Sequence, residues 1–179
     1  MEFRWRIAIL LVLAAASILL ALLSPPIPQD PSYHGFADQR TLAAVPNFWN
    51  VLSNLPFVVA GVYGFWAARS ARWAERWDRY PWLTIAAASV LIGFGSGYYH
   101  YSPDNRSLFW DRLPMTLAFM GVFVAAIMEY IHARSGAILL APFLLVGMLS
   151  VEVWRRGELT GVGDLRFYIL VQFLSLIHI

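Results

Sequence analysis

A serine, a histidine and an aspartate carry the chemistry that this sequence predicts. Ser96 and His100 are four residues apart in an apolar segment, so on a helix they share one face. Asp111 follows eleven residues after His100, beside the next apolar segment. A neutral imidazole binds zinc, a carboxylate accepts a proton from water, and a hydroxyl can hydrogen-bond an oxyanion. We therefore expect Ser96, His100 and Asp111 to form one membrane-embedded site that hydrolyses an amide or an ester.

Asp111 also has a structural alternative. It lies three residues before Pro114, a position that suits the cap of a helix with proline in its first turn. It could also form an ion pair with Arg112 or Arg106. A carboxylate has two oxygens, so neither role excludes a part in catalysis.

His100 is the one metal ligand that the sequence predicts with a clear reason. Catalytic zinc usually has three protein ligands, so a single histidine is not enough. His34 lies in a proline-rich stretch, and His132 is expected on the opposite side of the membrane. Neither is a strong candidate for a second ligand.

The composition indicates an integral membrane protein. Of the 179 residues, 59% are hydrophobic and 13% are charged, more apolar surface than a soluble domain of this length could bury. The absence of cysteine excludes disulfides and thiolate sites. The fold class is therefore all-α, a polytopic transmembrane bundle with about six spans. Uncharged runs that predict these spans cover residues 7–29, 41–68, 80–103, 113–128, 135–151 and 167–179.

Arginine placement predicts the orientation in the membrane. Four arginines crowd the loop 69–79, whereas the neighbouring loops carry few, so this loop and the N-terminus with Arg4 and Arg6 are expected to be cytoplasmic. The site then faces outward. Arginine without lysine suggests a GC-rich bacterial genome, hence a bacterial inner membrane.

The segments before the bundle divide into two parts. Residues 1–24 are expected to form a retained transmembrane anchor, with a signal peptide as the alternative. Residues 25–46 form the long outer polar loop, which begins with several prolines. Asp38 lies in its most polar part, and this part is expected to act as a lid or a second metal site.

Several of these residues resemble signature motifs of the alkaline ceramidases, a family grouped with the adiponectin-receptor-like membrane proteins. Ser96, His100 and Asp111, with Leu113-Pro114-Met115 after them, are similar to the first two motifs. The run 48–54, Phe-Trp-Asn-Val-Leu-Ser-Asn, resembles the start of the first conserved helix. The detailed resemblance covers residues 47–114, and a looser one continues to residue 173.

The resemblance implies a seven-helix core, here preceded by an extra N-terminal helix, with an intramembrane zinc that hydrolyses ceramide-like lipids. His100 would be a zinc ligand, Asp111 the carboxylate acting on the attacking water, and Ser96 the group beside the oxyanion. We expect a membrane lipid as the partner, and no nucleic acid. Calcium is doubtful, because Asp38 is the one clear acid in the stretch that corresponds to the family's acidic cluster, and Asn47 replaces a glutamate.

The C-terminal segment departs from the family pattern. The family's His-x-x-x-His pair is absent, and residues 174–179, Leu-Ser-Leu-Ile-His-Ile, match the translation of a common sequencing adapter. We expect residues 47–173 to be an incomplete bundle, residues 174–179 to be an artefactual tail, and this chain alone to be inactive. Two other functions stay open: a receptor-like or lipid-binding protein of the same fold, and a structural bundle with interfacial polar residues.

Overall fold

The computed structural model describes residues 2–177, without the side chains of residues 2–4, 6, 10 and 174–177. It confirms the all-α class. The helices are α1 (Glu2–Leu23), α2 (Phe48–Leu52), α3 (Leu55–Ser70), α4 (Tyr80–Tyr101), α5 (Asn105–Tyr130), α6 (Ala133–Leu159) and α7 (Arg166–Ile177), with two short 3-10 helices at Pro31–His34 and Arg76–Arg79.

Four segments of the described chain are long and apolar enough to cross a membrane: Phe48–Ser70, Arg76–Tyr101, Asn105–Tyr130 and Ala133–Leu159. The other two predicted spans correspond to shorter apolar helices. In α1 the apolar stretch is Ile7–Leu23, and α7 is described over 12 residues. The predicted span 41–68 begins late, because residues 41–47 form a turn and helix α2 starts only at Phe48.

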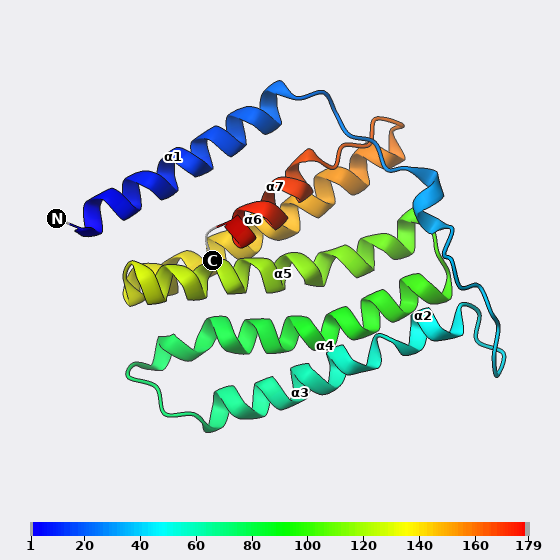
Figure 1. The fold of residues 1–179 in the computed structure, drawn as a ribbon, viewed down its shortest axis with the longest axis horizontal. Coiled ribbons are helices and arrows are strands. Elements are labelled where there is room, and N and C mark those ends of the chain that lie inside the picture. The colour runs from blue at the N-terminus through cyan, green and yellow to red at the C-terminus, as the bar shows by residue number, and fades with distance from the viewer. Residues whose placement is uncertain (1, 178–179) are drawn as a thin grey trace.

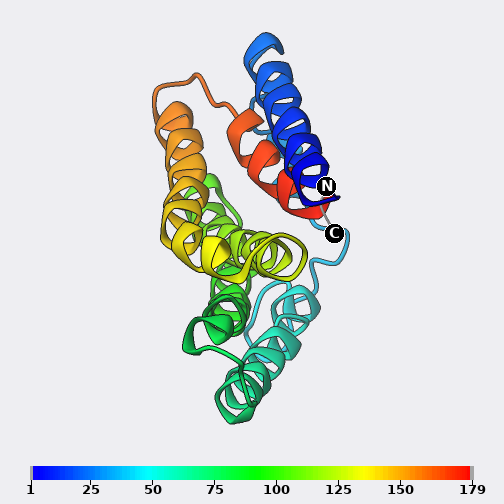
Figure 2. The same cartoon turned by 90° about the vertical axis from the view of Figure 1, so that its left-hand side faces the viewer.

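The helices lie side by side in the order α3, α4, α5 and α6, with α7 and α1 beyond them (Figures 1 and 2). Helix α5 is central and packs against α4, α6 and α7, while α1 contacts α7. The connecting segments 24–47, 102–104 and 160–165 gather at one end of the bundle, called the polar end below (Figure 1). The connections 71–79 and 131–132 lie at the opposite end.

Helix α5 begins with a capping box. The Asp104 carboxylate accepts a hydrogen bond from the Ser107 backbone N–H at 2.6 Å, and the Ser107 hydroxyl accepts one from the Asp104 N–H at 3.1 Å. Asp111 therefore lies inside α5, and the alternative prediction that it caps a helix is wrong. The physical reason is that an earlier aspartate with a serine three residues later starts the helix, which then runs through Pro114.

Helices α4 and α5 pack backbone to backbone where Gly95 faces the carbonyl of Trp110. Pro114 has no N–H, so the backbone carbonyl of Trp110, four residues earlier, lacks its usual helical donor. A Cβ on Gly95 would overlap that carbonyl oxygen. Small residues let membrane helices pack backbone to backbone. This contact holds Ser96 and Asp111, the next residue on each helix, close to each other.

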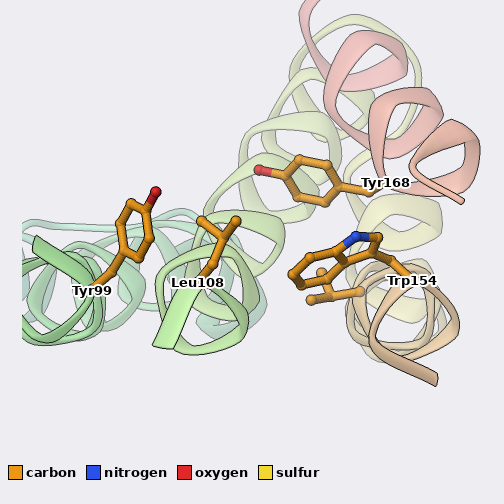
Figure 3. Close-up of a cluster of buried hydrophobic side chains, with 5 residues drawn as sticks. Tyr99, Leu108, Trp154 and Tyr168 are labelled. Atoms are coloured by element: carbon orange, nitrogen blue, oxygen red, sulfur yellow. The ribbon is translucent and has the colours of Figure 1, made fainter. Parts of the chain in front are cut away.

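An aromatic cluster fixes the helices at the polar end. Tyr99, Leu108, Trp154 and Tyr168 come from α4, α5, α6 and α7 and lie between these helices (Figure 3). Leu108 and Trp154 are fully buried. The cluster thus sets the relative positions of the helix segments that carry the candidate site.

Candidate functional site

The structure brings Ser96, His100 and Asp111 together at the polar end. Ser96 and His100 lie on the last turns of α4, and Asp111 lies on the second turn of α5. Ser96 is 8% exposed and Asp111 is 9% exposed. The side chain of Ser96 lies beside the carboxylate of Asp111, and the charge of Asp111 interacts with His100 and with Arg112. A hydroxyl, a carboxylate and an imidazole therefore share one largely buried environment.

The imidazole of His100 has an unsatisfied ring nitrogen. Its Nδ1 is buried and has no hydrogen-bond partner within the described part of the chain. A buried polar atom without a partner is costly, and its presence calls for a ligand, an ion or a water. On one side, the ring of Phe36 lies 4.6 Å from the imidazole, measured between ring centroids. This unpartnered nitrogen, on an imidazole that interacts with the charge of Asp111, fits a metal ligand.

The other histidines are not placed as further ligands. Both ring nitrogens of His34 are in use, Nδ1 with the Tyr99 hydroxyl at 3.1 Å and Nε2 with the Asn105 Oδ1 at 3.0 Å. His132 caps α6 at the opposite end of the bundle, as the sequence predicted. His178 lies outside the described residues. In the part of the chain that is described, no three metal-binding side chains converge, so these residues supply only part of a zinc coordination shell.

The segment 29–40 covers the site from the polar end. The Tyr99 hydroxyl donates to the backbone carbonyl of Tyr33 at 3.3 Å, and the Phe36 ring packs edge-on against Tyr99. The side-chain amide of Asn47, which follows this segment, donates to the backbone carbonyl of His100 at 2.9 Å. The loop thus reaches the candidate site through aromatic rings and hydrogen bonds.

Sequence reasoning missed the contact of Phe36 with His100, and those of His34 with Tyr99 and Asn105 next to the site. His34 and Phe36 precede the residues that they contact by about sixty or more positions, so no local spacing indicates that they meet. The prolines at the start of the loop 25–46 did not indicate the helix end onto which the chain returns. The one available signal was the polarity of the stretch 34–40.

Asp38 is engaged in an ion pair. Its two carboxylate oxygens accept hydrogen bonds from Arg40 Nε at 2.8 Å and from Arg40 Nη2 at 2.7 Å. These bonds lower the pKa of Asp38 to about 2. Its backbone carbonyl accepts a bond from the Asn50 amide at 2.7 Å. With a guanidinium held at the carboxylate, these residues do not fit a calcium or second metal ion. The segment around Asp38 does fit a cover over the site.

Asp111 forms no ion pair within 4.0 Å among the described residues. The alternative prediction that it pairs with Arg112 or Arg106 is therefore wrong. Arg112 points toward α6 and α7, where its guanidinium stacks on Trp154, and Arg106 is exposed to the surroundings. The carboxylate of Asp111 therefore lies beside Ser96 and is not paired with an adjacent arginine.

Comparison with known proteins places this geometry in one family. A family model described as Ceramidase matches residues 39–177. The match begins one residue after Asp38 and includes Ser96, His100 and Asp111. No curated protein and no solved structure matched the chain.

Proposed function

The chain belongs to the ceramidase family, and from this premise we propose that it is a zinc-dependent membrane hydrolase that cleaves the amide bond of ceramide-like lipids. Membership of the family supplies the reaction, hydrolysis of a ceramide in a membrane. The zinc dependence rests on a single observation. The Nδ1 of His100 is buried and has no hydrogen-bond partner among the described residues, and the carboxylate of Asp111 and the hydroxyl of Ser96 lie in the same environment.

Three side chains have distinct roles in the proposed reaction. When bound at His100, zinc would lower the pKa of a water and polarise the amide carbonyl. Asp111 accepts the proton that this water loses as its oxygen adds to the carbonyl carbon. The same proton then passes to the leaving nitrogen as the carbon–nitrogen bond breaks. The products are a fatty acid and a free amine.

Ser96 is suited to two tasks in this scheme. Its hydroxyl lies beside Asp111, where it can donate to the carboxylate and orient it before the reaction. A rotation about its side-chain bond would let the hydroxyl donate instead to the oxygen on which negative charge develops, the role that hydrogen-bond donors have in oxyanion holes. Both tasks need the hydroxyl, so Ser96→Ala is expected to lower the rate of hydrolysis.

The experiment uses protein expressed from its complete reading frame and purified in lipid nanodiscs. Bound zinc is measured by elemental analysis, and release of free fatty acid from a ceramide is measured by mass spectrometry. We expect His100→Ala to lose both zinc and hydrolysis. His132→Asn is the matched control, because it changes a histidine at the opposite end and keeps a residue that can cap α6.

Two results would count against the proposal. Hydrolysis that is unchanged in His100→Ala would remove the enzymatic role given to this residue. Zinc bound at His100 without any release of fatty acid would favour a receptor-like or lipid-binding protein of the same fold.

A further inference from the structure

Arg112 is a buried cation without an anionic partner. Its side chain lies in the middle of the bundle at the polar end and is 6% exposed. Its Nη2 donates to Oε1 of Gln29 at 2.7 Å, and its Nη1 is buried without a hydrogen-bond partner among the residues that the structure describes. An arginine has five N–H donors, so most of its capacity to bind an acceptor is unused.

The paired arginines at the polar end show what is missing. Arg40, Arg155, Arg156 and Arg166 each bind a carboxylate at 2.7–2.8 Å. Arg112, the most buried of them, has no carboxylate within 4.0 Å in the part of the chain that the structure describes. Its charge interacts with that of Asp111, but the two side chains form no ion pair within 4.0 Å.

The surroundings of Arg112 stabilise its positive charge but do not neutralise it. The guanidinium carbon lies 4.4 Å from the ring centroid of Trp154, 5.1 Å from that of Tyr168 and 5.7 Å from that of Tyr33. Cation–π contacts favour the charge without neutralising it. Burying a charge that is not neutralised is costly, so an anion that enters this place gains a strong interaction.

We propose that Arg112 forms a carboxylate-binding subsite that holds the fatty acid released at the neighbouring Asp111. A guanidinium matches a carboxylate with two parallel hydrogen bonds. In the present structure Oε1 of Gln29 occupies the place of one carboxylate oxygen on Nη2, and Nη1 is free for the other. The subsite rests on the proposed function, because hydrolysis of the amide is what creates a carboxylate beside Asp111.

The position of Arg112 favours a carboxylate at the scissile bond over a distant headgroup. Arg112 follows Asp111 directly on α5, so the two side chains leave the same turn of the helix. The residues around the guanidinium come from the covering segment, α6 and α7. A fatty acid would thus place its carboxylate beneath Gln29 and Tyr33, and its chain toward the membrane interior.

The test measures binding instead of turnover. The full chain is placed in nanodiscs of phosphatidylcholine with a chelator present, and equilibrium binding of labelled palmitic acid is measured. Palmitic acid methyl ester and hexadecyl phosphate are used as competitors. We expect unlabelled palmitic acid to compete and the methyl ester not to.

Two variants remove the subsite in different ways. Arg112→Gln removes the charge and should weaken palmitic acid binding at least about tenfold, since a hydrogen bond to a charged group contributes about 1.5–3 kcal/mol. Gln29→Glu puts a carboxylate of nearly the same shape on the Arg112 fork, which should stabilise the fold and also weaken binding at least about tenfold. Arg106→Gln, an exposed arginine of the same helix, is the control and should bind normally.

The outcomes separate this proposal from the proposed function. If both Arg112→Gln and Gln29→Glu bind palmitic acid as the unchanged protein does, the subsite is wrong, whether or not the protein hydrolyses ceramide. If hexadecyl phosphate binds through Arg112 and palmitic acid does not, the carboxylate assignment is overturned. If the protein binds palmitic acid through Arg112 but releases none from ceramide, the subsite stands and the hydrolase assignment fails.

Discussion

The side-chain amide of Asn47 donates a hydrogen bond to the backbone carbonyl of His100 over 2.9 Å. Asn47 is buried and has a φ of 47°, in the left-handed region. His100 lies in the last turn of α4, where backbone carbonyls have no partner within the helix. One residue at the start of the core thus fixes the helix end that carries the proposed zinc ligand.

Asn47→Gly should lower both the zinc affinity and the stability. Glycine adopts a positive φ without strain, so this change removes the amide and leaves the backbone conformation accessible. The uncapped, buried carbonyl should cost about 1–3 kcal/mol in the free energy of unfolding. Zinc titration and thermal unfolding measure the two effects. Ala44→Gly, at another left-handed position with φ 62°, is the control. Zinc affinity unchanged in Asn47→Gly would show that this bond does not position His100.

Asp111→Asn should reduce turnover much more than it reduces zinc binding. The amide keeps the size of the carboxylate and can still bond Ser96, but it cannot accept a proton from water at neutral pH. Ceramide hydrolysis and zinc content are measured on the same preparation. Equal losses of zinc and of turnover would contradict the role as base and would make Asp111 a ligand, since its position inside α5 already rules out a helix cap.

Gly95→Ala should separate α4 from α5. The added methyl group would meet the backbone carbonyl of Trp110, which cannot move out of the way as a flexible side chain could. Overpacking of this kind usually costs about 1–3 kcal/mol, and the shift should also move Ser96 away from Asp111. Thermal unfolding and ceramide hydrolysis measure both effects. Gly97→Ala is the matched control, because nothing lies within 4 Å of the added methyl group there. If the two variants behave alike, the close contact at Gly95 does not shape the site.

Asp104→Ala should destabilise the start of α5 by about 1 kcal/mol, the usual loss when an N-cap is removed. The bonds from Ser107 lower the pKa of Asp104 below its ordinary value of 3.8. A carboxylate with a lowered pKa stabilises the folded state above its ordinary pKa, and this contribution is lost as the pH falls through the lowered value. Thermal unfolding of the two proteins should therefore differ at neutral pH and converge under strongly acidic conditions. A difference that persists in acid would mean that the cap does not depend on the charge.

The orientation in the membrane can be tested with single cysteines, because the chain has none of its own. We predict that Arg106→Cys, at the polar end, reacts with an impermeant maleimide added from outside the cell, and that Arg72→Cys reacts only after the membrane is opened. Both residues are exposed. The opposite pattern would place the site on the cytoplasmic side.

The sequence by itself determined the helical class and the pairing of Ser96 with His100. Backbone groups in hydrocarbon must bond within the same segment, so long uncharged runs have little choice but to form helices. The spacing of four residues then puts the hydroxyl and the imidazole on one face at the end of α4. Both conclusions use only interactions between residues that are near each other in the chain.

Only the structure showed three further features. These are the start of α5 at Asp104, the segment that covers the site, and the direction of the Arg112 side chain. The position before Pro114 suggested Asp111 as a cap, and the bonds between Asp104 and Ser107 show that α5 starts at Asp104 instead. The contacts of Phe36 with His100 and of Gln29 with Arg112 join residues that are far apart in sequence. Such contacts depend on how helices and loops pack in three dimensions, so only the tertiary structure brings them onto the site.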